Sequence, residues 1–288
     1  GMILRDNLFG TPEEDALSRD FTINALAYNI ADFSIVDYCD GIIDLNQRLI
    51  RTIRDPYTRF KEDPVRMLRA IRFSASHNFV IENIVWEAIC NLSYTISNVS
   101  PARLYEEIQK LFLFGFSKKV FHLFIKSGLL SAPFPDILRW ISLSRKNMSL
   151  IYNNLDYLDK LYKDGKVLSI ELFLTFFLGP FIEADALVKH KNNVPYKQAL
   201  ENVCKDTLKN ICKTVTLPKR ISNTVHNILS LQQSFRTVPH RHPHSIIDKP
   251  GFPDAILYLR LKTETKNGKN DHLKWWDQFL KQKRMPPA

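Results

Sequence analysis

Residues Arg59 to Phe73 read RFKEDPVRMLRAIRF, and this stretch predicts the helix around which the fold is organised. Proline fits the first position of a helix, and the aspartate before it is a good N-cap. We therefore expect a helix that begins at Asp63-Pro64. Its apolar side consists of Leu68, Ile71 and Ala75. Its polar face consists of Glu62, Asp63, Arg66 and Arg69. At 100° per residue, these four residues fall within about a third of the helical wheel.

Two interpretations of that polar face remain open. In the first, Asp63 only caps the helix and Arg66 pairs with Glu62 one turn away. In the second, Asp63 accepts from the amino group of a base while Arg66 donates to the neighbouring ring nitrogen. Adenine and cytosine present that order, and guanine and uracil the reverse. An unpaired buried polar group costs about 1–3 kcal/mol, so the pair predicts acceptance of ATP and CTP over GTP and UTP without separating ATP from CTP.

A second polar block, SRDFTINAL, spans Ser18 to Leu26. Apolar residues at helical spacing predict a helix over Phe21 to Ile30, packed on a small sheet. Asp20 and Asn24 would then project together. Arg19 is a candidate for holding triphosphate charge, and Asp20 for accepting from a ribose hydroxyl. The alternative is an N-terminal cap followed by a polar helix face.

Composition restricts the class of protein. The chain has 288 residues, of which 45% are hydrophobic, which excludes a disordered protein. Its net charge of +10 favours a polyanionic partner, RNA or DNA before a membrane, although an ordinary basic protein has the same balance. The four cysteines form no C-x-x-C pair, which is typical of reduced thiols in a cytoplasmic protein. The most apolar run, Leu172 to Ile182, is too short to cross a bilayer and predicts a buried helix.

Apolar residues mostly recur at helical spacing, so a mainly α-helical protein is expected. The exception is the first fifth of the chain. There, Phe33 to Tyr38 predicts a strand, a turn follows at Asp40-Gly41, and Leu49 to Ile53 is a possible partner strand. Further helices are expected over Pro101–Phe112, over a long apolar segment from about 150 to 187, near 196–215, and around Trp275 and Trp276. Residues 237–253 are rich in Pro and His and indicate an irregular basic loop.

Four motifs in order resemble those of the class II nucleotidyltransferases, the family of CCA-adding tRNA nucleotidyltransferases and bacterial poly(A) polymerases. The motifs are SRDFTINAL, VDYCDGIIDL (Val36–Leu45), EDPVRMLRAIRF (Glu62–Phe73) and PARLYEE (Pro101–Glu107). Three further stretches are more similar to the poly(A) polymerases than to the CCA-adding enzymes: MILRDNLFGTPEED (Met2–Asp15), LPKRIS (Leu217–Ser222) and LKWWDQF (Leu273–Phe279). The chain departs from the family pattern at Ser18, where the family has arginine. It also contains neither the Gly-Ser phosphate-holding motif nor the Asp-x-Asp pair that binds Mg²⁺ in the family.

The resemblance implies a mainly α fold, with a helical neck, body and tail attached to a partial α/β nucleotidyltransferase head. It divides the chain into a C-terminal remnant of the head (1–55), a neck for nucleotide and base recognition (56–135), an RNA-binding helical body (136–240) and an RNA-binding tail (241–288). The chain is then expected to begin partway through the head.

The implied parent reaction is template-independent addition of AMP from ATP to RNA 3′-hydroxyls, with Mg²⁺ as the cofactor of the full-length enzyme. CCA addition to tRNA is the alternative, and a non-catalytic RNA-binding module is the alternative of another class. Because the Asp-x-Asp pair is absent, we expect no catalytic residue in this chain and no activity from the chain alone. The expected partners are ATP and RNA 3′ ends, the expected location is cytoplasmic, and no membrane is expected.

The resemblance also assigns candidate sites. The candidate nucleotide-binding residues are Arg19, Asp20, Asn24, Asp63, Arg66 and Arg69. The candidate RNA phosphate contacts are Arg103, Lys219, Arg220, Arg236 and Arg241. Trp275 and Trp276 are either a stacking surface for bases or, for one of them, core. Three histidines alternate in the Pro-rich stretch: His240, His242 and His244. A metal site is one interpretation, but a basic loop is favoured because no Cys or carboxylate ligands cluster nearby in the sequence.

Overall fold

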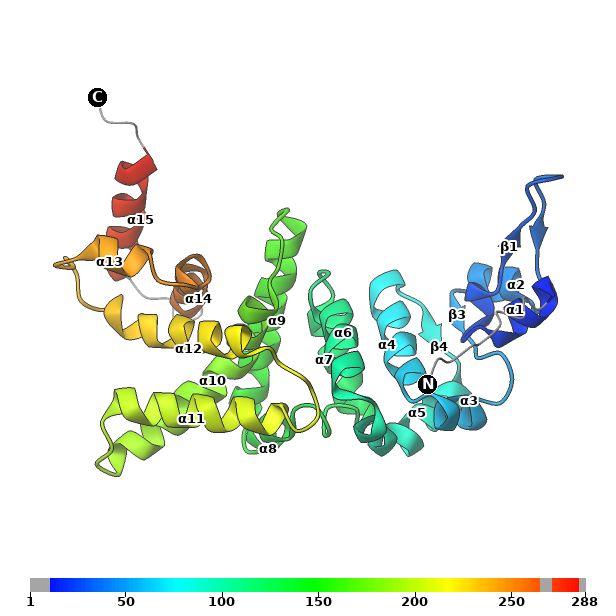
Figure 1. Ribbon diagram of the computed structural model, residues 1–288, viewed down its shortest axis with the longest axis horizontal. Coiled ribbons are helices and arrows are strands. Elements are labelled where there is room, and N and C mark those ends of the chain that lie inside the picture. Colours follow the sequence, from blue (N-terminus) through cyan, green and yellow to red (C-terminus); the bar gives the residue numbers. More distant parts are fainter. Residues whose placement is uncertain (1–10, 265–270, 285–288) are drawn as a thin grey trace, which may run out of the picture. The chain divides into compact units, whose positions relative to one another are not determined.

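A computed structural model describes residues 11–264 and 271–284 (Figure 1), and the described chain divides into two compact units. Unit 1 contains residues 11–99 and 122–132, and unit 2 contains residues 100–121, 133–264 and 271–284. The predicted mainly α class is confirmed, because the described ranges hold fifteen α-helices and four strands of two residues each. Parts of the predicted head and tail (1–10, 265–270 and 285–288) and most of the stretch MILRDNLFGTPEED lie outside the described residues.

Unit 1 combines short helices with two minimal sheets. Its first elements are α1 (Pro12–Ser18), the 3₁₀ helix η1 (Thr22–Asn24), β1 (Ala27–Tyr28), β2 (Ile35–Val36), α2 (Gly41–Gln47) and β3 (Leu49–Ile50). They are followed by α3 (Pro56–Glu62), α4 (Val65–His77), β4 (Val80–Ile81), α5 (Asn83–Leu92) and the 3₁₀ helix η2 (Ser93–Asn98). The end of α7 (Ser117–Ser127) and the residues up to 132 complete the unit.

The predicted helix over Phe21–Ile30 is wrong. The chain forms only η1 there and then continues into β1, and Ile30 is 80% exposed instead of packed in a stripe. The reason is pairing with a distant segment. The N–H of Thr22 donates to the carbonyl of Arg51, and the N–H of Ile53 donates to the carbonyl of Asp20. These bonds hold Phe21 extended, with a φ of −129°, and override the local helical pattern.

The predicted strand pairing is also wrong. The strand expected over Phe33–Tyr38 is present only as β2, which pairs antiparallel with β1, so that Ala27 faces Val36. The expected partner segment contains β3, which instead pairs parallel with β4. A parallel pair needs a long crossover, here α3 and α4, and a strand pattern two residues long carries no information about such a distant partner.

The VDYCDGIIDL motif builds the start of α2. Asp37 accepts hydrogen bonds from the N–H groups of Cys39, Gly41 and Ile42. Although burial raises the pKa of this carboxyl, those backbone bonds lower it overall. Asp44, at the end of the motif, is buried and accepts a 2.6 Å hydrogen bond from the Thr22 hydroxyl. The motif therefore attaches α2 to the SRDFTINAL block.

Gly41 sits where this attachment is closest. A Cβ at this position would lie 2.3 Å from the Thr22 carbonyl oxygen, a backbone atom that cannot swing away. We expect Gly41→Ala to lower the free energy of unfolding by about 1–3 kcal/mol, because the two segments must separate. Urea unfolding followed by circular dichroism checks this. Gly165→Ala tests a different cause, since Gly165 has open space around it and only a positive φ of 83° to strain an alanine. Equal stability of Gly41→Ala and the unsubstituted protein would contradict the packing argument.

The helix predicted to begin at Asp63-Pro64 needs one correction. α3 ends at Glu62, Asp63 is extended with a φ of −146°, and α4 begins at Val65. Glu62 and Asp63 therefore do not share a helical face with Arg66 and Arg69. Proline disfavours the helical conformation of the residue before it, which separates the two helices at Asp63. The predicted apolar side is confirmed, because Leu68, Ile71 and Ala75 are all buried.

Unit 2 is entirely helical within its described residues. Besides the start of α7, its elements are α6 (Pro101–Phe112), α8 (Pro135–Ser142), α9 (Arg145–Lys163), α10 (Ile170–Lys191), α11 (Tyr196–Ile211), α12 (Lys219–Ser234), α13 (Pro243–Ile247), α14 (Phe252–Glu264) and α15 (Asp271–Arg284). The first half of α10 is buried on nearly every side, and the helix packs against α8, α9, α11, α12 and α14. α10 is thus the core helix of the unit.

Most helix predictions for unit 2 are confirmed. α6 buries the predicted Leu104, Ile108, Leu111 and Phe112, and Leu172–Ile182 forms part of the buried α10. The long apolar segment from 150 to 187 divides into α9 and α10 near Gly165, whose φ of 83° a helix cannot accommodate. The predicted irregular stretch 237–253 contains the short α13. Within the described residues, no helix combines the length and hydrophobicity needed to cross a membrane.

Candidate functional site

The predicted nucleotide-binding residues converge in unit 1 around one carboxylate. Asp20, whose side chain is 10% exposed, lies between two arginines of α4. Its Oδ1 accepts a 2.9 Å hydrogen bond from Arg66 Nε, and its Oδ2 lies 2.6 Å from Arg69 Nη1. The second contact is an ion pair only, because Oδ2 accepts no hydrogen bond of good geometry. The SRDFTINAL block and α4 are therefore joined through a largely buried charge cluster.

A third arginine, Arg59 of α3, joins this cluster to the SRDFTINAL block. It is 7% exposed, and its Nη2 donates to the carbonyl oxygens of Ser18 and Arg19 at 2.7 and 2.8 Å. Its Nη1 donates to Glu62 at 2.9 Å, and Arg66 Nη1 donates to the same carboxylate oxygen at 2.9 Å. The hydrogen bond from Arg66 lowers the pKa of Glu62, with a further contribution from the charge of Arg59. The Arg66–Glu62 pair of the structural interpretation is thus present.

The donors of Arg66 are mostly used inside the protein. Nε goes to Asp20, and Nη1 is shared between Glu62 and the carbonyl of Arg59. No hydrogen bond involves Nη2 within the part of the chain that the structure describes. Arg69 is 35% exposed and holds Asp20 through Nη1 alone. The cluster comprises Arg59, Arg66 and Arg69 against Asp20 and Glu62, so it carries one net positive charge and keeps donor capacity for an anionic or polar ligand.

Asp63 lies at the turn between α3 and α4. Its carbonyl accepts from the N–H of Arg66, and its Oδ1 accepts a 3.2 Å hydrogen bond from the N–H of Val65. The N-cap position of α4 is Pro64, one residue later than predicted, and Asp63 contributes this one hydrogen bond to the first turn as a partial cap. A carboxylate offers about four acceptor positions, so this cap is compatible with a further hydrogen bond to a ligand.

Two other candidates stand apart from the cluster. Arg19 is exposed and pairs with Asp15 of α1 at 2.6 Å, so only its backbone carbonyl joins the cluster, through Arg59. Asn24 lies in η1, and its side chain forms no hydrogen bond with the cluster among the described residues. Since the helix that was to align Asn24 with Asp20 is absent, their predicted shared face is wrong.

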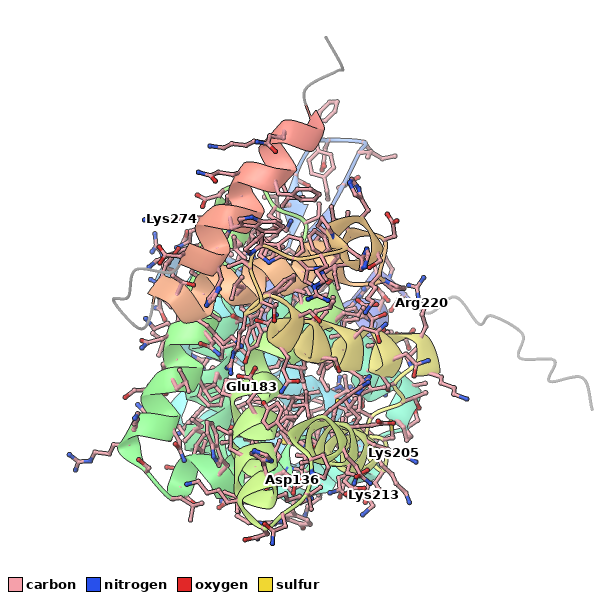
Figure 2. All side chains as sticks on the ribbon, turned by 90° about the vertical axis from the view of Figure 1, so that its left-hand side faces the viewer. Asp136, Glu183, Lys205, Lys213, Arg220 and Lys274 are labelled. Atoms are coloured by element: carbon pink, nitrogen blue, oxygen red, sulfur yellow. The ribbon has the colours of Figure 1, made fainter. Side chains whose placement is uncertain are left out.

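The five RNA candidates form two groups in unit 2. Lys219 and Arg220 begin α12, and the N–H of Thr216 just before them donates to the carbonyl of Pro101 at the start of α6, the helix of Arg103. In the view of Figure 2, Lys205 and Lys213 lie on the same side as Arg220. Arg236 follows the other end of α12, whose sixteen residues span about 24 Å, and Arg241 lies in the loop after it.

The aromatic and histidine candidates belong largely to the core of unit 2. Trp276 is fully buried and contacts Phe235 edge-to-face, which confirms that one tryptophan is core, while Trp275 stacks on Phe279. His240 packs on Trp276. Among the described residues, no group of three or more His, Cys, Asp or Glu side chains is placed to hold a metal ion.

Sequence reasoning missed Arg59. Its role depends on two backbone carbonyls about forty positions away, which no local pattern reveals. The available signal was the spacing Arg59, Glu62, Arg66, because arginines three and four positions from one carboxylate bind it together.

Comparison with known proteins follows the same parts of the chain. Three family models match, described as the poly A polymerase head domain (residues 5–51), the probable RNA and SrmB-binding site of polymerase A (78–141) and the polymerase A arginine-rich C-terminus (192–287). Poly(A) polymerase I of Escherichia coli is 34% identical over 286 residues, covering 97% of this chain and 61% of the relative. The chain belongs to the bacterial poly(A) polymerase and CCA-adding enzyme family. It spans about three fifths of the length of the poly(A) polymerases it matches.

In sequence, family members of the CCA-adding type match a shorter part of the chain. The CCA-adding enzyme of Lactobacillus johnsonii is 40% identical over 116 residues, 40% of this chain and 29% of the relative. A crystal structure of a tRNA nucleotidyltransferase with a primer tRNA and an incoming ATP analogue has a TM-score of 0.64 at 23% identity, covering 96% of this chain and 75% of that one. At this identity the likeness shows a shared fold, and the expected architecture of the family is thereby confirmed.

Proposed function

We propose that this chain serves in template-independent addition of AMP from ATP to RNA 3′-hydroxyls. The observation that supports the proposal is the arginine cluster of unit 1, in which Asp20 holds Arg66 and Arg69 while guanidinium donors are left over. Asp63 precedes these arginines at the turn between α3 and α4, where its carbonyl accepts from the N–H of Arg66. The likeness to poly(A) polymerase I along nearly the whole chain supports the reaction class. The proposal keeps the division into head remnant (1–55), neck (56–135), body (136–240) and tail (241–288).

Within this proposal, the cluster selects the nucleotide. Asp63 accepts from the amino group of adenine, and Arg66 Nη2 donates to the neighbouring ring nitrogen. Asp20 is the positioning residue: by holding Arg66 Nε and Arg69 Nη1 it fixes the direction of both guanidinium groups. Arg69 and Arg19 offer charge to the triphosphate, and Asn24 and the exposed edge of Asp20 remain candidates for the ribose.

Mg²⁺ is the ion that the resemblance implies. Glu14 and Asp15, the acidic residues nearest the SRDFTINAL block, are engaged with Thr11 and Arg19. Together with the lack of a metal-binding cluster in residues 11–264 and 271–284, this means that the described side chains do not fit a two-carboxylate magnesium site. We assign no step of the reaction to the ion.

The experiment is a tailing assay with labelled ATP or CTP on an RNA primer. The chain alone is expected to incorporate no nucleotide, because Asp-x-Asp is absent from its 288 residues. Joined to the Asp-x-Asp-bearing part of a relative's head, it is expected to add AMP repeatedly. Repeated tailing by the chain alone would contradict the first expectation. Addition of CMP before a single AMP would favour CCA addition, for which the 40% identity to a CCA-adding enzyme is the supporting observation. RNA binding without tailing by the joined protein would favour a non-catalytic module.

RNA binding is proposed for the basic corner formed by Lys219, Arg220 and Arg103. Lys219 and Arg220 are exposed and form no ion pair within the described residues. The double variant Lys219→Ala/Arg220→Ala is expected to reduce the slope of log K against log salt by about 1.4 for single-stranded RNA, since each lost phosphate contact removes about 0.7. Filter binding from 50 to 300 mM salt measures the slope. The control is Lys146→Ala/Arg145→Ala on α9, and an equal loss in both pairs would argue against a defined site.

A further inference from the structure

A cavity of about 580 Å³ lies in unit 2, away from the residues assigned above except Arg236. It is bounded by α10, α11, α12, α14 and α15. Its lining is Glu183, Leu187, His190, Tyr196, Gln232, Gln233, Phe235, Arg236, Leu259, Lys262 and His272. Glu183, labelled in Figure 2, belongs to the middle of α10. The volume is within the range of sites that hold a small organic ligand.

One wall of the cavity is internally satisfied. Glu183 accepts from the Tyr258 hydroxyl at 3.3 Å and from Lys262 Nζ at 2.8 Å. Burial raises the pKa of Tyr258 well above its usual value, and the neighbouring Glu183 charge raises it further, so this hydroxyl stays protonated and donates. Because the charges of Glu183 and Lys262 neutralise each other, this wall of the cavity carries an ion pair and no net charge.

A second wall carries unsatisfied atoms. Gln232 is 4% exposed, and its Nε2 donates to the carbonyls of Ile228 and Ala255, which fixes the opposite atom, Oε1, as an acceptor. Oε1 is buried and has no hydrogen-bond partner, and the same holds for Nδ1 of His272. An unmade buried hydrogen bond costs about 1–3 kcal/mol, so Gln232 Oε1 points to a ligand that brings its own donor, whereas Nδ1 of His272 donates or accepts according to the tautomer of its ring.

The remaining lining is aromatic and cationic. The ring of Tyr196 meets that of His190 edge-to-face at 6.0 Å, and Phe235 lies on the same cavity. Burial and the charge of Glu183 raise the pKa of Tyr196, whereas the charge of Arg236, which lines the same cavity, lowers it. Arg236 is exposed and has no ion-pair partner in the described chain, so its charge is available at the mouth of the cavity.

We propose that this cavity binds one amino-bearing nucleotide, such as adenylate. The amino group of the base donates to Gln232 Oε1, the base lies against the rings of Tyr196 and His190, and the phosphate pairs with Arg236. A free nucleotide and a single residue of an RNA strand have this same chemistry. The site is separate from the Asp63 and Arg66 cluster and does not depend on the polymerase reaction.

The test is calorimetric titration of the full chain with AMP, with purine riboside 5′-monophosphate, which lacks the amino group, and with pentaadenylate. Arg236→Ala is expected to weaken AMP binding about tenfold, and purine riboside monophosphate to bind about tenfold more weakly than AMP. Arg145→Ala, an exposed arginine of α9 outside the cavity, is the matched control. Arg69→Ala silences the cluster of unit 1 and is expected to leave this binding in place.

The pattern of results decides the proposal. AMP binding that Arg69→Ala abolishes and Arg236→Ala leaves unchanged would overturn it, as would no binding of any of the three probes. Equal affinity for AMP and purine riboside monophosphate would overturn the role of Gln232. If pentaadenylate binds more tightly than AMP with the same loss in Arg236→Ala, the source is an RNA strand; equal affinity of the two identifies a free nucleotide. Since Arg236 is exposed, Arg236→Ala is expected to fold normally, and circular dichroism checks this. Arg236→Lys is expected to recover part of the affinity.

Discussion

Asp20→Asn is expected to lower the free energy of unfolding of unit 1 by about 3 kcal/mol. The substitution removes the negative charge between Arg66 and Arg69 and leaves two guanidinium groups facing a neutral amide. Breaking a buried, hydrogen-bonded charge pair by removing one partner costs about 3–5 kcal/mol, and the partial exposure of Arg69 places this case at the low end. Because the carboxylate also fixes the guanidinium directions, nucleotide affinity should fall with it.

Urea unfolding followed by circular dichroism measures the stability. Hydrogen exchange of the α3 and α4 amides assigns the loss to this region. The control is Asp15→Asn, which removes a carboxylate from an exposed pair with Arg19 and is expected to change stability by less than about 1 kcal/mol. If the two variants unfold alike, the Asp20 cluster does not hold the SRDFTINAL block onto α4.

The unsubstituted chain is expected to prefer ATP over GTP by a factor of about 10 to 100. Asp63→Ala is expected to reduce this preference to near unity. Under the proposed function, the wild-type preference rests on the acceptor that Asp63 presents to the adenine amino group, and the carbonyl of guanine would leave this acceptor unpaired. Alanine removes the acceptor for both bases. Arg66→Ala is a poorer test, because Arg66 also binds Asp20, Glu62 and the carbonyl of Arg59, and its loss would disturb the whole cluster.

Competition binding of the four nucleoside triphosphates to the chain gives the ratio directly. Asp32→Ala serves as control, since Asp32 lies in an exposed turn where it accepts hydrogen bonds from the N–H and hydroxyl of Ser34. We expect it to leave the ATP to GTP ratio unchanged. A ratio that Asp63→Ala does not alter would remove base selection from this residue and leave it a structural role at the start of α4.

Local patterns predicted the helices of this protein well, and their failures have one common cause. The helices α6 and α10 and the apolar side of α4 were predicted from stripes of apolar residues. Such a stripe indicates that one side of a helix is buried, regardless of which element covers it. The segment 21–30 also has a stripe. The backbone at its start, however, forms hydrogen bonds with residues 51–53. A pattern within ten residues contains no information about a pairing segment thirty positions away.

The same distinction applies to the candidate site. Charge spacing within Arg59–Arg69 predicted that Arg66 meets Glu62, since both partners lie within one turn of chain. It predicted neither the break at Asp63 as the boundary of α3 nor the capture of Arg66 and Arg69 by Asp20, forty-six positions away from Arg66.

The amino-acid sequence by itself determined the helical class, the family and the residues that carry charge, because periodicity, motif order and residue type are local properties. Only the tertiary structure decided which charges meet. It showed that Asp20, a candidate ligand for ribose, also holds two arginines, and it placed Gln232, which has an unpaired oxygen, on a cavity formed by five helices. The physical reason is that burial, and with it the cost of an unpaired charge or acceptor, exists only once distant segments have packed together.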